Sequence, residues 1–294
     1  MTNLTGRVIL VTGAGGGLGR DHALLLARHG ARIAVNDLSA EAAQSVADEI
    51  AAAGGEALAV AGSVADFDAV QAMVRQISDT WGRIDGLVNN AGILRDKSFA
   101  KMDLADFRLV MDVHLMGAVH CCKAVWPLMQ AQGFGRIVMT TSSSGLYGNF
   151  GQSNYGAAKM ALVGLMQTLS LEGARHDIRV NCIAPTAATQ MLDGLLPEAE
   201  LDLLQPRFVS PGVVALLRDD APTRTILCAG AGAFAAANVT LTKGKMVGTG
   251  PDTAAALVTA WDDVTDRTGE AVPASGAAQG TQELAHAGYT RGGS

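Results

Sequence analysis

The sequence predicts an α/β fold, in which one doubly wound parallel β-sheet carries helices on both faces. Three features of the sequence support this prediction. Short apolar runs alternate with helical patterns, the runs (VILVT, for example) are almost continuously apolar, and a glycine cluster follows the first run. Strands that are separated by helices pair in parallel through right-handed crossovers, and a sheet covered on both faces needs apolar side chains on both sides.

Seven segments are predicted to be strands because they are short and apolar. They are residues 7–12, 32–36, 56–60, 84–88, 135–141, 178–183 and 224–228. Helical patterns between them include residues 40–53, 104–131 and 153–175. We expect residues 1–250 to form a single domain.

Two segments depart from this alternation. Residues 186–212 contain three prolines and no strand pattern, and a long connection after a strand end is a natural substrate lid. Residues 251–294 are expected to form a C-terminal extension that begins with a helical piece, Thr253–Trp261. Its last part, 269–294, is rich in small residues and cannot build a core alone, so we expect it to be flexible or docked on a neighbouring subunit.

The composition excludes several classes of protein. Charged residues make up 17% of the 294 residues and the net charge is −6, so no basic block is present to bind nucleic acid. Apolar runs end well before the roughly 18 residues that a membrane span needs, and no signal peptide precedes the first strand. The four cysteines show no CxxC spacing, which indicates free buried thiols and no metal site. We expect a cytosolic protein.

The segment Thr12–Gly19, TGAGGGLG, lies between the first strand and the first helix. Glycines there let the backbone approach a pyrophosphate, whose charge is stabilised at the positive end of the helix. The residues expected to contact it are Gly13, Gly16, Gly17, Leu18 and Gly19. This position predicts a Rossmann-type dinucleotide-binding domain.

Asp37 ends the second strand, where a carboxylate can accept the adenosine ribose hydroxyls and would repel a 2′-phosphate. No Arg or Lys occurs at 36–40, and Arg20 is the nearest basic residue. Asp37 could instead serve only as a turn residue or helix cap. Together with the glycines it favours NAD over NADP.

Tyr155 and Lys159 are four residues apart in a helical pattern and therefore share a helix face. An ammonium at roughly 4–5 Å, with an effective dielectric near 20, contributes about 3–4 kcal/mol. That energy equals about two to three pKa units, enough to bring a phenol into the range of a working base. Ser142 ends the strand RIVMTT and can donate to a substrate carbonyl, although Ser143 and Ser144 compete for this role and Ser142 could be a turn residue.

Taken in order, TGxxxGxG, NNAG (Asn89–Gly92), Ser142, Tyr155 and Lys159 resemble the short-chain dehydrogenase/reductase family over roughly residues 5–230. The resemblance implies that Tyr155 is the general acid/base and that Ser142 orients the substrate. It also implies that Lys159 binds the nicotinamide ribose and lowers the pKa of the tyrosine. The further cofactor neighbours that it implies are Ser63, Val64, Asn90, Ala91, Gly92, Ile183 and Pro185, with Ser63 standing where an Asp is usual.

Two departures from the family pattern stand out. The NxxG element, whose Asn holds a helix bend and a proton-relay water, reads HLMG, so His114 is either a relay residue or an interior histidine. The segment ILCAGAGAF lacks the DGG that usually follows the last strand, which puts the packing of the C-terminal part in question.

Longer stretches, including NNAGILRDKSFAKM and GRIVMTTSSSGLYGNFGQSNYGAAK, are similar to the (3R)-hydroxyacyl-CoA dehydrogenase domains of peroxisomal multifunctional enzymes type 2. These domains are also classed as 17β-hydroxysteroid dehydrogenases. The resemblance implies a (3R)-hydroxyacyl-CoA or steroid substrate and a homotetramer or homodimer, with 104–131 and 153–175 at the interface. The alternatives are an NADPH-dependent 3-ketoacyl reductase and a dinucleotide-binding scaffold without catalysis.

Overall fold

The computed structural model describes residues 4–187 and 198–289. It divides the chain into two compact units, Met1–Ala236 and Ala237–Ser294. The boundary follows Ala236 rather than residue 250, because the last strand of the sheet ends at Ala237.

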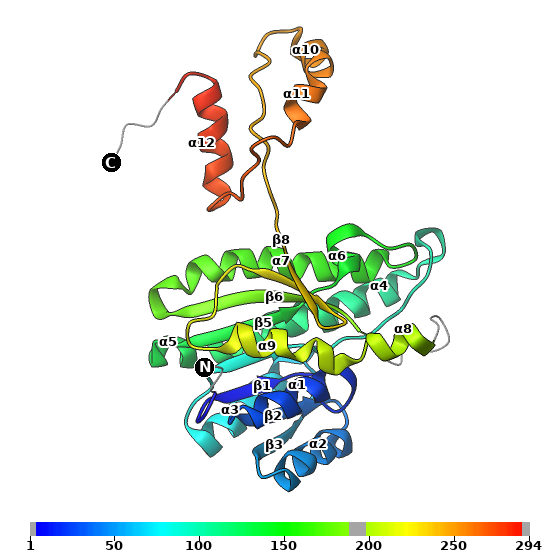
Figure 1. Cartoon of the computed structure of the whole chain (residues 1–294), viewed down its shortest axis with the longest axis vertical. Helices are drawn as coiled ribbons and strands as arrows, with labels where there is room; N and C mark the ends of the chain where they lie inside the picture. The colour runs from blue at the N-terminus through cyan, green and yellow to red at the C-terminus, as the bar shows by residue number, and fades with distance from the viewer. Residues whose placement is uncertain (1–3, 188–197, 290–294) are drawn as a thin grey trace. The chain divides into compact units, whose positions relative to one another are not determined.

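The first unit contains a single sheet of eight strands in the order β3-β2-β1-β4-β5-β6-β7-β8 (Figure 1). The strands are β1 (Val8–Val11), β2 (Arg32–Asp37), β3 (Glu56–Ala61), β4 (Gly86–Asn89), β5 (Gly135–Thr140), β6 (Ile178–Thr186), β7 (Ile226–Gly230) and β8 (Ala233–Ala237). All neighbours from β3 to β7 pair in parallel. The order reverses at β1 and β4, so the sheet is doubly wound and the predicted fold class is confirmed.

All seven predicted strands are present, and β8 is an addition. Ala231 and Gly232 connect β7 to β8 with φ of 51° and 75°. Two consecutive residues with positive φ form the tight turn typical of β-hairpins. The segment without the expected DGG therefore turns back along the edge of the sheet.

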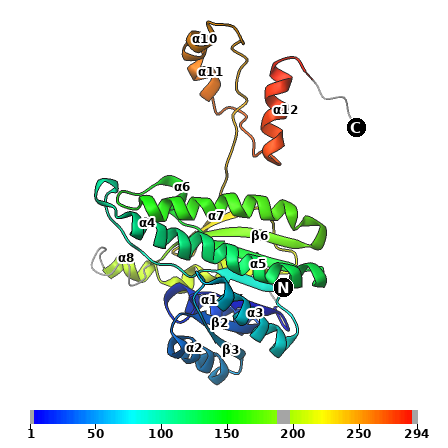
Figure 2. The ribbon, with the colours of Figure 1, turned by 180° about the vertical axis from the view of Figure 1, so that it is seen from behind.

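The helices form a layer on each face of the sheet (Figures 1 and 2). One layer contains α1 (Gly17–Arg28), α2 (Ala40–Ala52) and α9 (Ser210–Leu217), and the other contains α3 (Phe67–Trp81), α4 (Leu104–Met111), α5 (Gly117–Gln132) and α7 (Ser153–Glu172). Shorter helices are η1 (Phe99–Lys101), α6 (Ser143–Tyr147), η3 (Ala174–His176), α8 (Glu198–Leu203) and η5 (Pro206–Phe208).

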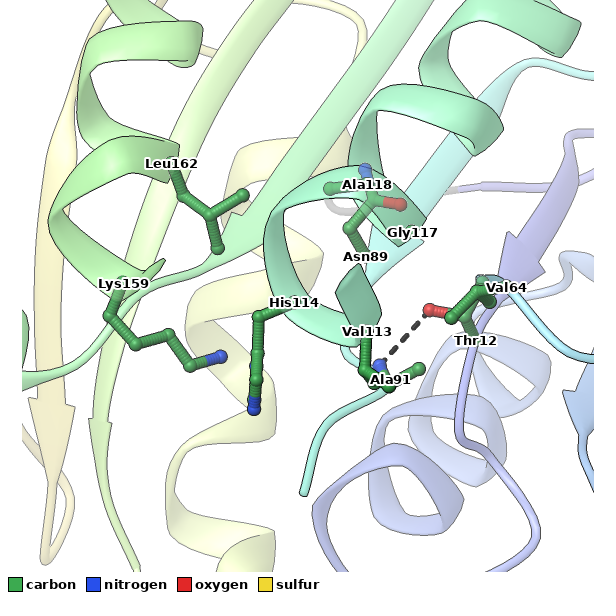
Figure 3. A pocket seen from close by; sticks show the side chains of 10 residues that line it. All are labelled: Thr12, Val64, Asn89, Ala91, Val113, His114, Gly117, Ala118, Lys159 and Leu162. Carbon is green, nitrogen blue, oxygen red and sulfur yellow. Dashed lines mark hydrogen bonds between the residues drawn. The ribbon is translucent and has the colours of Figure 1, made fainter. Parts of the chain in front are cut away.

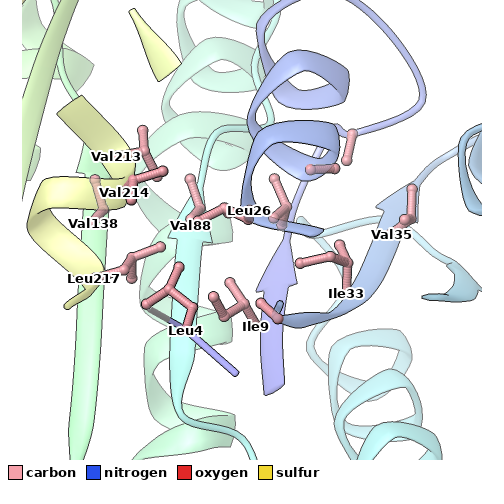
Figure 4. Packing of buried hydrophobic residues seen from close by; sticks show 14 of the residues in the cluster. Leu4, Ile9, Leu26, Ile33, Val35, Val88, Val138, Val213, Val214 and Leu217 are labelled. Carbon is pink, nitrogen blue, oxygen red and sulfur yellow. The ribbon is translucent and has the colours of Figure 1, made fainter. Parts of the chain in front are cut away.

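The main core lies between the sheet and the layer of α1 and α9 (Figure 4). Leu26 of α1 and Leu217 of α9 pack there with strand residues such as Ile33 and Val88, all at most 2% exposed. Burial of each such side chain contributes about 1.5–3 kcal/mol. This packing fixes α1 against β1 and β2, and therefore fixes the loop that joins α1 to β1.

Helices α4 and α5 form one helical run, Leu104–Gln132, that is interrupted by a π-helical turn, η2 (Asp112–Met116). Within the described parts of the chain, this is the one helix long and apolar enough to cross a membrane, and 39% of its most apolar window is buried. It contacts α3 and α7 and strands β4 and β5, as expected of a core helix.

The predicted lid, 186–212, can be compared with the structure only in part, since residues 188–197 lie outside the described residues. After α8 and η5 the chain enters α9, whose first residues, Ser210 and Gly212, are buried. The last residues of the predicted lid therefore belong to the body of the domain.

The second unit contains α10 (Thr253–Thr259), α11 (Trp261–Thr265) and α12 (Gly276–His286). The helical piece expected at 253–261 is present, and 269–294, expected to lack a core, contains α12. Leu241 forms an antiparallel bridge with Ala271, and Gln282 donates to the carbonyl of Thr242 at 2.9 Å. None of the described residues 238–289 is buried, so this unit has no core of its own.

Candidate active site

The glycine-rich loop joins β1 to α1, and its surface is open where a phosphate would lie. Gly16 is the N-cap of α1 and gives no side-chain cap, so backbone N–H groups of the first turn are left for a ligand. A Cβ at Gly16 or Gly17 would meet nothing within 4 Å, whereas the loop is closed on its inner side. The loop thus presents an uncapped, positive helix end to open space, which suits an anion.

The inner side of the loop is held by the NNAG segment. A Cβ on Gly13 would lie 2.7 Å from the Cα of Ala91, and one on Gly19 would lie 2.2 Å from the carbonyl oxygen of Gly13. The Asn90 side chain donates to the carbonyls of Thr12 and Gly13 at 3.0 and 3.1 Å. These contacts require glycine at both positions and give Asn90 a role in shaping the loop.

Asp37 stands at the carboxyl end of β2, beside the same loop. Its Oδ2 accepts from the N–H of Gly15 at 3.0 Å, and its Oδ1 accepts from the N–H of Ser39 at 3.1 Å. Each oxygen retains a lone pair for a further donor. Arg20 is engaged elsewhere, because its guanidinium binds Glu49 at 2.6 and 2.9 Å.

The other residues implied as cofactor neighbours line the carboxyl ends of the strands. Val64, after β3, is 7% exposed and Ser63 precedes it, with its hydroxyl accepting from the Ala65 N–H at 3.2 Å. On β6, Ile183 is fully buried and Pro185 is partly exposed. The carbonyl of Ile183 accepts from the N–H of Thr141, which ties β6 to the end of β5.

Three side chains meet where β5 ends. Ser142 follows β5 and caps α6, while Tyr155 and Lys159 lie one turn apart on α7. The Ser142 hydroxyl lies close enough to the Tyr155 phenol to lower its pKa, and the Lys159 Nζ lies 5.4 Å from the centre of the Tyr155 ring. Lys159 is 3% exposed and donates to the carbonyl of Thr140 at 2.6 Å. The structure brings all three predicted residues together.

Burial is the largest influence on the pKa values of Tyr155 and Lys159. Burial raises the pKa of Tyr155, the hydrogen bond from Ser142 lowers it, and the charge of Asp96 raises it, with a net rise. Burial lowers the pKa of Lys159 to about 7. Lys159 is not among the groups that shift the pKa of Tyr155 in the protein alone, and the lowering of that pKa by Lys159 stays a prediction.

His114 lies in the π-helical turn and is 4% exposed. Its Nε2 is 2.8 Å from the carbonyl oxygen of Ile93, and its Nδ1 is buried without a hydrogen-bond partner. Burial, and to a lesser extent the charge of Lys159, lower the pKa of His114 to about 3, so the ring is neutral at pH 7. The ring packs edge-on against Tyr155 with centroids 5.2 Å apart.

Gly92 explains how this ring is accommodated. A Cβ on Gly92 would lie 2.3 Å from His114 Cε1, so the imidazole fills the space that a larger residue would take. The ring lies in the π-helical turn, where the regular hydrogen bonding of the helix is interrupted.

A small cavity of about 10 Å³ lies beside these groups (Figure 3). Its polar lining is made by Thr12, Asn89, His114 and Lys159, and the Lys159 amine points toward the His114 ring. A volume of this size is about that needed by one water molecule.

Several residues that position the site are not predicted from the sequence. Thr12 Oγ1 accepts from the N–H groups of Asn90 and Ala91 at 3.0 and 3.1 Å, and Thr141 Oγ1 donates to the carbonyl of Lys159 at 2.6 Å. The side chain of the buried Asn154 donates a hydrogen bond to the carbonyl of Arg95 at 2.9 Å. Only Thr12 carried a signal, because it directly precedes the glycine cluster.

These residues fit a nicotinamide dinucleotide. The open helix end would hold its pyrophosphate, Asp37 its adenosine ribose, and Lys159 its nicotinamide ribose. Among the described residues, no group of three or more His, Cys, Asp or Glu could hold a metal ion.

Comparison with known proteins agrees with this arrangement. A family model described as short chain dehydrogenase matches residues 7–199. Peroxisomal multifunctional enzyme type 2 of Drosophila melanogaster is 49% identical over 223 residues, which cover 73% of this chain and 37% of that protein. A putative short-chain type dehydrogenase/reductase of Mycobacterium tuberculosis is 47% identical over 229 residues, covering 75% of this chain and 80% of that protein. A 3-oxoacyl-[acyl-carrier-protein] reductase of Synechocystis is 44% identical over 218 residues, covering 73% and 88%.

Two solved structures are similar. The full-length Drosophila multifunctional enzyme has a TM-score of 0.82 at 39% identity, and the match covers 99% of this chain and 51% of that one. A 7α-hydroxysteroid dehydrogenase complexed with NADH and 7-oxo glycochenodeoxycholic acid has a TM-score of 0.73 at 31% identity, covering 79% and 95%. The chain thus spans about half or less of the length of the Drosophila enzyme. It belongs to the short-chain dehydrogenase/reductase family of oxidoreductases, which act on CH–OH groups.

Proposed function

We propose that the chain is an NAD-dependent dehydrogenase that oxidises the secondary alcohol of a (3R)-hydroxyacyl-CoA, or of a hydroxysteroid, to the ketone. The observation that carries the proposal is the contact of Tyr155 with Ser142 beside the buried Lys159, at the same sheet edge as the glycine-rich loop. An acid/base, a hydroxyl donor and a cation stand together there.

The preference for NAD rests on Asp37 and Arg20. A 2′-phosphate at the end of β2 would face the Asp37 carboxylate, and the nearest guanidinium is already paired with Glu49. NADP would therefore bring an unpaired negative charge against a carboxylate. The similar 7α-hydroxysteroid dehydrogenase, solved with NADH, is in line with this preference.

In the oxidation, Tyr155 takes the hydroxyl proton of the alcohol while Ser142 hydrogen-bonds the same substrate oxygen. Bound NAD would accept the hydride and, in its oxidised form, would supply a positive charge that favours the phenolate. Lys159 adds its own charge when protonated and holds its position through the carbonyl of Thr140. These contributions oppose the effect of burial on the pKa of Tyr155.

We further propose that His114 serves the proton route as a neutral hydrogen-bonding group. Its unpartnered Nδ1 and the Lys159 amine border the cavity that has room for about one water molecule. A pKa near 3 makes a protonated imidazole too costly an intermediate at neutral pH. The neutral ring would therefore hydrogen-bond through Nδ1 and would not carry the charge.

The acyl-CoA or steroid substrate is inferred from the sequence resemblance to the dehydrogenase domains of multifunctional enzymes. Apolar side chains are exposed near the site: Phe150 is 91% exposed and Tyr147 is 73% exposed, both in the segment between Ser142 and Tyr155. Such side chains suit an apolar substrate.

The second candidate is an NADPH-dependent 3-ketoacyl reductase. The Synechocystis reductase favours it, because the chain covers 88% of that protein. Asp37 and the paired Arg20 argue against it. A non-catalytic scaffold is disfavoured because Ser142, Tyr155 and Lys159 are all present and lie together near the end of β5.

A substrate panel tests the proposal and the Tyr155→Phe variant tests its mechanism. We expect wild type to oxidise (3R)-hydroxybutyryl-CoA or estradiol with NAD at least tenfold faster than with NADP, measured as kcat/KM. Tyr155→Phe should lose activity by at least a hundredfold, because it removes the acid/base, and should bind NADH with unchanged affinity in fluorescence titration. A faster rate with NADPH would select the reductase, and a Phe variant with wild-type rate would remove Tyr155 from the mechanism.

We propose that the chain assembles as a homo-oligomer. A groove of about 180 Å³ between α5 and α7 is lined by Val119, Cys122, Trp126, Leu165 and Leu169, among others, and an apolar groove there is in line with the homotetramer or homodimer that we propose. We also propose a cytosolic location, whereas several relatives have the word peroxisomal in their names.

A further inference from the structure

Three segments around the active site meet at one side chain, Gln152, which caps α7 three residues before Tyr155. Its Nε2 donates to Asp96 Oδ2 at 2.7 Å. Its Oε1 accepts from Ser144 Oγ at 2.8 Å and from Asn149 Nδ2 at 3.1 Å. Gln152 therefore connects the loop after β4, helix α6 and the start of α7.

Asp96 decides which way the Gln152 amide points. An ionised carboxylate can only accept hydrogen bonds, so the NH₂ group of Gln152 must face it. The amide oxygen is then left to face the hydroxyl of Ser144. Without the carboxylate the amide could rotate by half a turn, and Ser144 would lose its acceptor.

The chain of hydrogen bonds continues to the catalytic hydroxyls. The N–H of Ser144 donates to Ser142 Oγ at 3.2 Å, and the Ser142 hydroxyl in turn lies beside the Tyr155 phenol, whose pKa it lowers. Because one lone pair of Ser142 Oγ is occupied by this N–H, its own proton is directed toward the phenol or a substrate oxygen. The position of Ser144 therefore sets the direction of the Ser142 hydroxyl.

The loop that carries Asp96 is anchored on both sides. The N–H of Lys97 donates to the carbonyl of Gly151 at 2.9 Å, and the fully buried Asn154 donates to the carbonyl of Arg95 at 2.9 Å. Asp96 is exposed, but its backbone is fixed to the beginning of α7. Its carboxylate therefore occupies a defined place beside Gln152.

We propose that Asp96 and Gln152 are positioning residues that, through Ser144, fix the Ser142 hydroxyl relative to the Tyr155 phenol. The inference rests on the proposed dehydrogenase function. Neither residue needs to touch the substrate for this role, because both act through the backbone and hydroxyl of Ser144.

Asp96 also acts on Tyr155 through its charge. The ionisable groups that face or neighbour Tyr155 among the described residues are Lys159 on α7, His114 in the π-helical turn and Asp96 in the loop. The negative charge of Asp96 raises the pKa of Tyr155. Replacement of Asp96 by Asn removes this charge and keeps an amide oxygen that can accept from Gln152, whereas Asp96→Ala removes the charge and the acceptor together.

The kinetic test uses Asp96→Ala, Gln152→Ala, the double variant and Asp96→Asn. We expect each Ala variant to lower kcat for acetoacetyl-CoA reduction by NADH about tenfold, since small misplacements of reacting groups are costly. KM for NADH should not change. The double variant should lose no more than the worse single variant, because both residues serve one chain of contacts. The proposal would be overturned if the losses of kcat multiplied in the double variant, or if the two single variants kept the wild-type kcat.

The second test follows the ionisation of Tyr155 without turnover, by ¹³Cζ-tyrosine NMR of the chain's three tyrosines, with Tyr155→Phe to assign the resonance. In Asp96→Asn, Tyr155 should titrate at lower pH than in wild type. Asp106→Asn is the matched control, since Asp106 pairs with Lys97 and Arg95 and does not contact Gln152. An unmoved Tyr155 titration in Asp96→Asn, or an equal shift in Asp106→Asn, would contradict the role of Asp96.

The substrate panel and the Tyr155 titration distinguish a failure of the proposed function from a failure of the role proposed for Asp96. A wild type that turns over no substrate in the panel would end the proposed function, while the Tyr155 titration would still decide whether Asp96 acts on the phenol. Thermal unfolding and NADH binding of every variant show whether a loss of kcat reflects misfolding.

Discussion

Lys159 is the residue at which catalysis and stability oppose each other. Its side chain is 3% exposed, and its ammonium donates to the carbonyl of Thr140. Burial lowers its pKa from the ordinary value of 10.5 to about 7. Between pH 7 and 10.5, Lys159 is therefore protonated in the unfolded chain and neutral in the folded chain. The free energy of unfolding rises with pH in this range.

We expect Lys159→Met to abolish turnover and to unfold at a higher temperature than wild type at pH 6. The advantage should shrink between pH 7 and 10.5, as the unfolded lysine loses its proton, and it should be measurable by thermal unfolding at several pH values. Lys101→Met, at an exposed position of η1, is the control. A Lys159→Met variant with the pH dependence of wild type would contradict the burial argument.

At the scale of elements, α1 and α9 are joined by a buried polar pair. His22 of α1 is fully buried, and its Nδ1 lies 2.8 Å from Ser210 Oγ of α9. Burial lowers the pKa of His22 from 6.5 to about 3. Between pH 6.5 and 3, His22 is protonated in the unfolded chain and neutral in the folded chain. The free energy of unfolding therefore falls as the pH is lowered through this range.

His22→Met should therefore gain stability relative to wild type as the pH is lowered from about 7 to about 4. Ser210→Ala is the matched comparison: it should lower the free energy of unfolding by about 1–3 kcal/mol, the usual cost of removing a buried hydrogen-bond partner. It should also keep the wild-type pH slope, because burial is the cause of the shift. Urea unfolding followed by circular dichroism at each pH measures both, and equal slopes in wild type and His22→Met would refute the assignment.

At the scale of the whole molecule, the two units differ in how much they bury. The main core cluster contains residues only up to Ala229, whereas the described part of the second unit leaves Val258 75% exposed and Trp261 57% exposed. A segment without a buried core opens at little free-energy cost.

We expect brief trypsin treatment to cut first in the second unit, at Lys243, Lys245 or Arg267, and to leave a fragment that still binds NADH. Mass spectrometry of the products and fluorescence titration of the fragment provide the measurement. If these sites resisted cleavage in the full chain, the unit would be covered by a neighbouring subunit, which is the alternative that the sequence left open.

How much of the structure the sequence predicts depends on how far apart in the chain the interacting residues lie. Apolar alternation and the glycine cluster predict the seven parallel strands and the phosphate loop, because both are encoded within one element and its connection. β8 was not predicted, since small residues such as Ala233 and Ala236 have little strand propensity and only the Ala231–Gly232 turn places them at the sheet edge.

The sequence by itself determined the fold class, the family and the identities of Ser142, Tyr155 and Lys159, because these depend on local pattern and order. The tertiary structure alone decided the ionisation of those groups. Burial raises the pKa of Tyr155 and lowers those of Lys159 and His114, and burial is a sum over segments far apart in the chain. It also decided that Asp96 meets Gln152, since 56 residues separate them and only the packing of the loop on α7 brings them together.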